Sequence, residues 1–116
     1  MNKINYDKRI FKSVSNSASG EVSSETTFYY YQKEDVVWAT YAGGAVKFGT
    51  LVAKVLKRDA LEMRYSHVNE RGELMTGECL STPEILPDGR IRLYEKWQWT
   101  CGDYSAGESV VEEVTA

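Results

Sequence analysis

The sequence predicts an all-β protein: a single antiparallel meander of about eight strands, closed into a small up-and-down barrel over residues 1–116. Three observations favour this fold. Apolar and polar residues alternate with a period of two, most clearly over residues 91–101. The segments that alternate are separated by short, turn-forming connectors. No segment has the run of about ten residues at helical periodicity that a packed helix requires.

Glycine and other turn-forming residues divide the chain into alternating segments, most of them longer than the average strand of about five or six residues. Gly43–Gly44 and Asp88–Gly89 predict tight two-residue hairpins, because glycine accepts the positive φ angles of such turns. Since the connectors are short, each strand is expected to pair with its sequence neighbour. We expect strands over residues 9–14, 21–32, 36–41, 45–56, 60–68, 73–85, 90–101 and 108–114.

We expect the sheet to close into a barrel, because a meander without helices has no other element to cover it. Such a sheet has one apolar face and two unpaired edges, and a barrel covers both at once. A β-sandwich is the alternative, which the short connectors disfavour because it needs long crossovers. Gly49 and Gly77 fall within strands, where they predict either a bend or bulge, or space for a neighbouring aromatic ring.

The hairpins also predict which side chains face the interior. A loop at Asp88–Gly89 sets Glu78 opposite Trp99, and a turn at residues 69–72 gives a second register. The two registers place the same side chains on one face, which we expect to be the inside of the barrel. This face carries Leu61, Met63, Tyr65, Leu74, Leu80, Ile91, Leu93, Trp97 and Trp99.

Three ionisable residues share this interior phase: His67, Glu78 and Glu95. A carboxylate among tryptophans needs a partner or a shifted pKa, because an unpaired buried charge is costly. Glu78 is the one candidate for a catalytic acid or base, since its expected neighbours Met63 and Trp99 cannot neutralise it. The alternative is that the three groups satisfy one another or lie in water at the barrel ends.

The expected register keeps these three residues apart, in steps of about 13 Å along the strands. Such steps are too long for proton transfer or for ligation of one metal ion, so we expect neither a metal site nor a cofactor. Cys79 and Cys101 are expected on opposite sides of the sheet, as free thiols rather than a disulfide.

An interior that mixes aromatic and polar side chains is typical of a site for an apolar or aromatic small molecule. We take the ligand-binding candidates to be Tyr65, His67, Glu78, Glu95, Trp97 and Trp99. One alternative is an interaction or structural module, acting as a homodimer through the exposed tyrosines of residues 21–32. A second alternative is an enzyme that uses Glu78 as its acid or base.

Charge and hydropathy limit the classes of partner and the cellular location that we expect. The formal net charge of −3 gives no reason to expect nucleic acid or an anionic membrane as a partner. No apolar stretch is long enough to span a bilayer, and residues 1–11 do not read as a secretory signal, so we expect a cytoplasmic protein.

Five short segments together carry a resemblance: Tyr41-Ala42-Gly43-Gly44, Met75-Thr76-Gly77, Ser81-Thr82-Pro83-Glu84, Pro87-Asp88-Gly89-Arg90 and Trp97-Gln98-Trp99. Over residues 30–113 the chain resembles a family of short bacterial proteins of unknown function, some of which are automatically labelled N-acetylglutamate synthase. An acetyltransferase of that kind is expected to have a mixed α/β domain and a loop that grips pyrophosphate, and the sequence predicts neither. The resemblance therefore implies a shared fold and not that activity. In architecture alone, the predicted meander also looks like the avidin, lipocalin and fatty-acid-binding barrels, an analogy that does not fix function.

Overall fold

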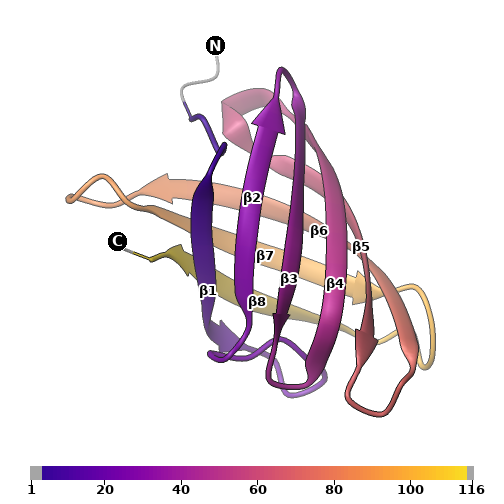
Figure 1. Cartoon of the computed structure of the whole chain (residues 1–116). Helices are drawn as coiled ribbons and strands as arrows, with labels where there is room; N and C mark the ends of the chain where they lie inside the picture. Colours follow the sequence, from indigo (N-terminus) through magenta and orange to yellow (C-terminus); the bar gives the residue numbers. More distant parts are fainter. Residues whose placement is uncertain (1–3, 115–116) are drawn as a thin grey trace.

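A computed structural model of the protein describes residues 4–114 and has eight antiparallel strands in a closed barrel (Figure 1). The prediction of a closed meander is therefore confirmed. Each strand pairs with the next in sequence, and the last pairs with the first. In chain order the elements are β1 (Arg9–Asn16), β2 (Thr27–Lys33), β3 (Val36–Gly43), β4 (Val46–Val55), the 3-10 turn η1 (Lys57–Asp59), β5 (Leu61–Asn69), β6 (Leu74–Ile85), β7 (Ile91–Trp99) and β8 (Ala106–Glu113).

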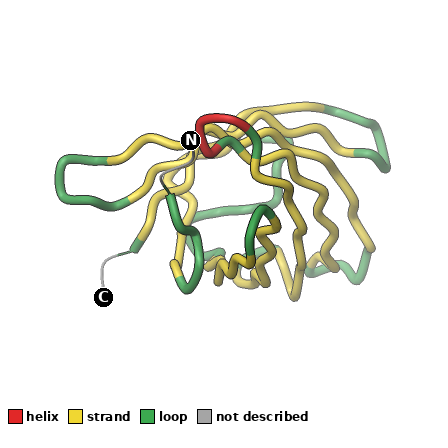
Figure 2. Tube along the Cα trace, turned by 90° about the horizontal axis from the view of Figure 1, so that it is seen from above, coloured by secondary structure: helices red, strands yellow, loops and turns green. Residues whose placement is uncertain are grey.

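One end of the barrel is closed by the chain itself. The segment before β1 and the η1 turn lie together over this end, near the N-terminus in Figure 2. Tyr6 is fully buried there, and its hydroxyl donates a hydrogen bond of 2.6 Å to the backbone oxygen of Asp59. Phe11 and Tyr30 pack beneath it, with ring centroids 4.7 Å apart. The interior at this end is therefore filled by side chains.

The two hairpins that flank β6 differ from the prediction in a way that changes the inside of the barrel. Each has a three-residue loop rather than an even-numbered one. Asn69 N donates to Glu73 O at 3.0 Å around one loop, and Leu86 N donates to Arg90 O at 2.8 Å around the other. Each loop ends in a glycine of positive φ, as expected when a type I turn is followed by a left-handed residue. The Asp88–Gly89 pair is thus part of a loop over residues 87–89.

A register shift of one residue moves every side chain of a strand to the other face. In β6 the residues that face inward are Gly77, Cys79 and Ser81. Leu74 and Leu80, which we expected inside, are 67% and 44% exposed. Both predicted registers contained the same one-residue error on the same strand, which is why they agreed with each other. The expected inward faces of β5 and β7 are correct.

The segment before β2 is a loop, not the start of the strand predicted over residues 21–32. Thr26 N donates to Ser23 O at 2.9 Å in a turn, and Thr26 Oγ1 donates to Gly43 O at 3.0 Å. The strand begins only at Thr27. Residues 17–26 therefore form a loop that crosses the second end of the barrel, at the bottom of Figure 1.

The two mid-strand glycines make room for rings. A Cβ atom on Gly49 would overlap Tyr41, and one on Gly77 would overlap Tyr65. Both cysteines, Cys79 and Cys101, are free thiols, and Cys79 faces inward rather than outward as expected. Within residues 4–114, no helix is long and apolar enough to cross a membrane.

Candidate functional site

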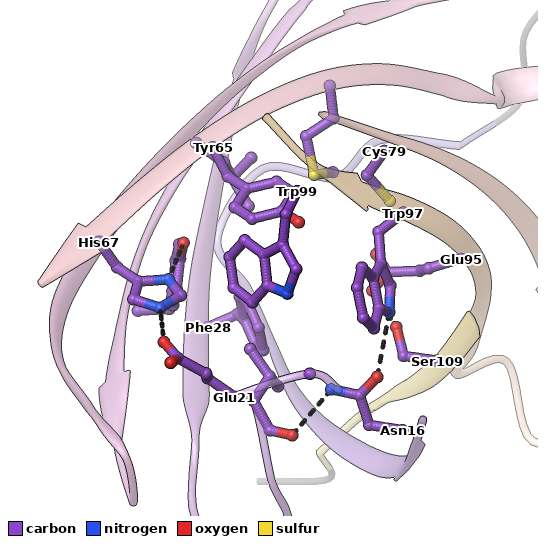
Figure 3. Close-up of a pocket in the computed structure, with 15 residues that line it drawn as sticks. Asn16, Glu21, Phe28, Tyr65, His67, Cys79, Glu95, Trp97, Trp99 and Ser109 are labelled. Carbon is purple, nitrogen blue, oxygen red and sulfur yellow. Dashed lines mark hydrogen bonds and ion pairs between the residues drawn. The ribbon is translucent and has the colours of Figure 1, made fainter. Parts of the chain in front are cut away.

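A cavity opens at the second end of the barrel, beneath the loop of residues 17–26 (Figure 3). The space free of atoms is about 490 Å³ with the open mouth and adjoining solvent included, and about 50 Å³ admits the centre of a water-sized sphere. The lining residues come from strands around the barrel and from the loop above it. They are Asn16, Gly20, Glu21, Val22, Phe28, Tyr41, Leu51, Met63, Tyr65, His67, Cys79, Glu95, Trp97, Trp99 and Ser109.

Aromatic rings line the cavity from several strands of the barrel. Trp97 and Trp99 of β7 are 7% and 5% exposed and face inward, with ring centroids 5.7 Å apart. Tyr65 of β5 meets Trp99 edge to face at 5.9 Å. Across the barrel, Phe28 and Tyr41 stack at 4.8 Å. The rings leave flat apolar surfaces for a ligand to contact.

Glu95 of β7 places a carboxyl group in the barrel interior. Its oxygens accept hydrogen bonds from Ser81 Oγ at 2.8 Å and from Ser109 Oγ at 3.1 Å. Removal from water raises its pKa, and the two serine hydroxyls partly oppose that rise. Within the described part of the chain, no lysine, arginine or histidine forms an ion pair with it. Glu95 is thus a carboxylate held by neutral donors.

A chain of hydrogen bonds runs from the cavity wall to the loop. His67 is 2% exposed, and its Nε2 lies 2.8 Å from Glu21 Oε1. An ionised carboxylate has no proton to give, so Nε2 is the donor. The other ring nitrogen, Nδ1, lies 3.0 Å from the hydroxyl of Tyr41. Both nitrogens of His67 are therefore occupied by protein groups.

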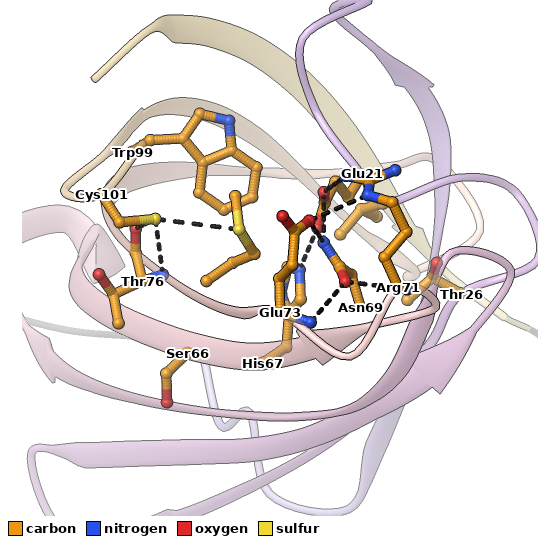
Figure 4. Close-up of polar contacts among 12 residues, drawn as sticks. Glu21, Thr26, Ser66, His67, Asn69, Arg71, Glu73, Thr76, Trp99 and Cys101 are labelled. Carbon is orange, nitrogen blue, oxygen red and sulfur yellow. Dashed lines mark hydrogen bonds and ion pairs between the residues drawn. The ribbon is translucent and has the colours of Figure 1, made fainter. Parts of the chain in front are cut away.

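The loop of residues 17–26 is tied to the barrel by side chains rather than by strand pairing (Figure 4). Besides His67, the Glu21 carboxylate accepts hydrogen bonds from Asn69 Nδ2 at 3.0 Å and Arg71 Nη2 at 3.4 Å. On the other side of the mouth, Asn16 Nδ2 donates to Val22 O at 2.9 Å. These contacts hold the loop over the mouth as a cover.

The phenols and the thiol in the wall are neutral. Burial raises the pKa of Tyr41, of Tyr65 and of Cys79 well above their ordinary values. A neutral buried thiol is a poor nucleophile, so Cys79 contributes shape and apolar surface. Among residues 4–114, no three His, Cys, Asp or Glu side chains lie close enough to hold a metal ion.

Five of the residues predicted to bind a ligand line this one cavity: Tyr65, His67, Glu95, Trp97 and Trp99. His67 and Glu95, expected at well-separated heights, thus share a cavity although they do not contact each other. Glu78 is on the outside, and its placement in the interior was wrong. Its side chain is 45% exposed and lies 3.7 Å from the guanidinium of Arg64. The apolar surroundings on which its predicted acid or base role depended are absent.

Sequence reasoning did not find the polar residues that cover and edge the cavity, such as Asn16, Glu21 and Ser109. Asn16 and Glu21 flank a polar connector whose composition indicates only a turn. Ser109 lies on β8, where the alternation is weak. Their positions are set by contacts between residues far apart in sequence, for which a single sequence carries no local signal.

Comparison with known proteins agrees with the fold. A protein-family model described as Avidin-like protein matches residues 4–114, which is nearly the whole chain. Searches of curated proteins and of solved structures find no match to the chain.

Proposed function

The chain belongs to the avidin-like protein family, and from its open-ended cavity we propose that it binds a small molecule inside the barrel. The observation that carries this proposal is a cavity whose walls are aromatic but whose interior holds a few directed polar groups. That combination is usual for sites that bind small molecules.

The wall suggests where each part of a ligand would lie. An apolar or aromatic body would fit between Trp97 and Trp99 on one side and Phe28 on the other. A polar group would face Glu95, or the hydroxyl of Tyr65, which has no hydrogen-bond partner among residues 4–114. The loop of residues 17–26 would close over the bound molecule and exclude water.

Binding can be tested by a thermal-shift screen of metabolites, since a ligand that binds the folded state raises its melting temperature. The three tryptophans supply a matched control. Ligands that bind in the cavity should quench the fluorescence of Trp97 and Trp99, and this response should survive Trp38→Phe on the outer face. Trp99→Phe should weaken binding. Ligands whose binding depends on Trp38 and not on Trp99 would contradict the proposal.

A second candidate function is self-association through the outer face of β2, β3 and β4. Six large apolar side chains are exposed on these neighbouring strands: Tyr29, Tyr31, Val36, Trp38, Phe48 and Val52. Tyr31 and Trp38 pair across the strands with ring centroids 6.0 Å apart. Aromatic side chains are enriched at interfaces between proteins. Sedimentation equilibrium should show a dimer that Trp38→Lys dissociates, whereas a wild-type monomer at millimolar concentration would rule it out.

A further inference from the structure

We infer that the ligand of this cavity is an organic cation, a protonated amine on an apolar or aromatic body, and that Glu95 is its counter-ion. This inference rests on the proposed function and specifies the class of molecule bound. It starts from an imbalance of charge inside the barrel.

Glu95 has no cationic partner among residues 4–114. Its oxygens accept hydrogen bonds from two serine hydroxyls, Ser81 and Ser109, which are neutral donors. Hydrogen bonds of this kind orient a carboxylate but do not neutralise it, and a carboxylate removed from water favours an opposite charge nearby. A ligand could supply that charge.

The other described lining residues form no ion pair with Glu95, and the basic one among them, His67, is hydrogen-bonded to Glu21. Neither lysine nor arginine lines the cavity within the described residues. The other lining carboxylate, Glu21, already accepts hydrogen bonds from His67, Asn69 and Arg71. Glu95 is therefore the lining carboxyl group that remains available to a ligand.

The aromatic rings of the lining also favour a cation. The faces of Trp97, Trp99 and Tyr65 carry negative electrostatic potential, which attracts a cation placed over them. An anionic ligand would meet these faces and the Glu95 carboxylate together. A neutral ligand would leave Glu95 without a counter-ion. A cation is the one charge class that both features favour.

The ionisable groups around Glu95 do not alter this balance. Tyr30, Tyr41, Tyr65 and Cys79 all sense its charge, and burial keeps the pKa of each high, so they stay neutral near pH 7. Burial also raises the pKa of Glu95 itself. A bound cation favours the ionised carboxylate, so the cation should bind more tightly as the pH rises through the pKa of Glu95.

Three probes of similar size separate charge from shape: 2-phenylethylammonium, neutral 2-phenylethanol and anionic phenylacetate. Their affinities are measured by titration calorimetry with the wild type, Glu95→Gln and Glu78→Gln. Glu78→Gln is the matched control, because it removes the same charge from the outer face. The wild type should bind the ammonium probe at least about ten-fold more tightly than the alcohol. Glu95→Gln should abolish this preference and Glu78→Gln should keep it.

The other outcomes of this experiment contradict the inference. If the wild type binds the alcohol as tightly as the ammonium, or phenylacetate more tightly, this inference fails while the proposed function stands. If none of the three probes binds, the inference fails, and the metabolite screen decides the proposed function separately. A second measurement, the pH dependence of binding, uses the wild type alone and so does not depend on whether the variants fold. The preference for ammonium over alcohol should grow as the pH rises through the pKa of Glu95, at pH values where the amine stays charged, and a preference that does not change with pH would overturn the inference.

Discussion

Trp97 and Trp99 point into the barrel from the same face of β7. Trp99 donates its indole N–H to the loop that crosses the open end, and Trp97 donates to Asn16 at the end of β1, which itself holds that loop. Trp97 Nε1 lies 3.0 Å from Asn16 Oδ1, and Trp99 Nε1 lies 3.0 Å from Ser19 O. The aromatic wall of the cavity is therefore bonded to its cover. A change in either tryptophan should affect the stability of the barrel and the position of the loop together.

Trp97→Ala should lower the free energy of unfolding by about 3–5 kcal/mol, through lost burial and the space left behind. For a domain of ordinary stability, about 5–15 kcal/mol, this is a large fraction. The measurement is urea unfolding followed by circular dichroism. Trp38→Ala is the control: Trp38 is 41% exposed on the outer face and should cost about 1 kcal/mol or less. Equal losses for the two variants would contradict the assignment of inside and outside.

Glu95→Gln should make stability less sensitive to pH. The pKa of Glu95 is raised in the folded protein by burial, so the folded state keeps this proton to higher pH than the unfolded state. In that window the wild type loses stability as the pH rises, and a glutamine cannot contribute to that loss. Without ligand, the variant should therefore gain stability relative to the wild type as the pH rises above about 4, the ordinary pKa of a glutamate, measured by urea unfolding. If the variant instead loses stability relative to the wild type as the pH rises, the folded state favours the ionised carboxylate.

Glu21→Gln should loosen the cover of the cavity. The amide keeps the shape of the side chain but loses the charge that strengthens its hydrogen bonds to His67 and Arg71. Backbone amides of residues 17–26 should exchange with deuterium about ten-fold faster, while those of β7 stay protected. Glu25→Gln, in the same loop but exposed, is the control. Similar exchange in both variants would mean that Glu21 does not hold the loop.

Gly77→Ala should destabilise the barrel by about 1–3 kcal/mol, because the new methyl group displaces the ring of Tyr65. The cause can be isolated with a double-mutant cycle. In a Tyr65→Ala background the same change should cost much less, because the ring that it displaces is gone. Thermal and urea unfolding of the four proteins provide the comparison, and strictly additive losses would contradict this account.

The barrel was predictable because the signals for it are local. The alternation of residues 91–101 fixed β7 as a strand with Trp97 and Trp99 on one face, and the short connectors required neighbouring strands to pair. The inward face of β5, with Met63 and Tyr65, followed in the same way. Each of these conclusions depends on residues within one strand or one turn.

The face of β6 was not predictable with the same reasoning, because it depends on the number of residues in two loops. Residues 69–73 and 86–90 are each compatible with more than one turn geometry. A difference of one loop residue exchanged Glu78 for Cys79 as the inward side chain. The glycines at the end of each loop, Gly72 and Gly89, are the signal that could have indicated a three-residue loop.

By itself, the sequence determined the strand order, the closure of the barrel and the inward faces of β5 and β7, since periodicity and turn chemistry act over a few residues. Only the tertiary structure decided that Glu95, and not Glu78, is the carboxylate facing the cavity without a cation. It also decided that Asn16 and Glu21 hold the cover. These outcomes depend on side chains from distant strands meeting across the barrel, such as Glu21 with His67, 46 residues apart.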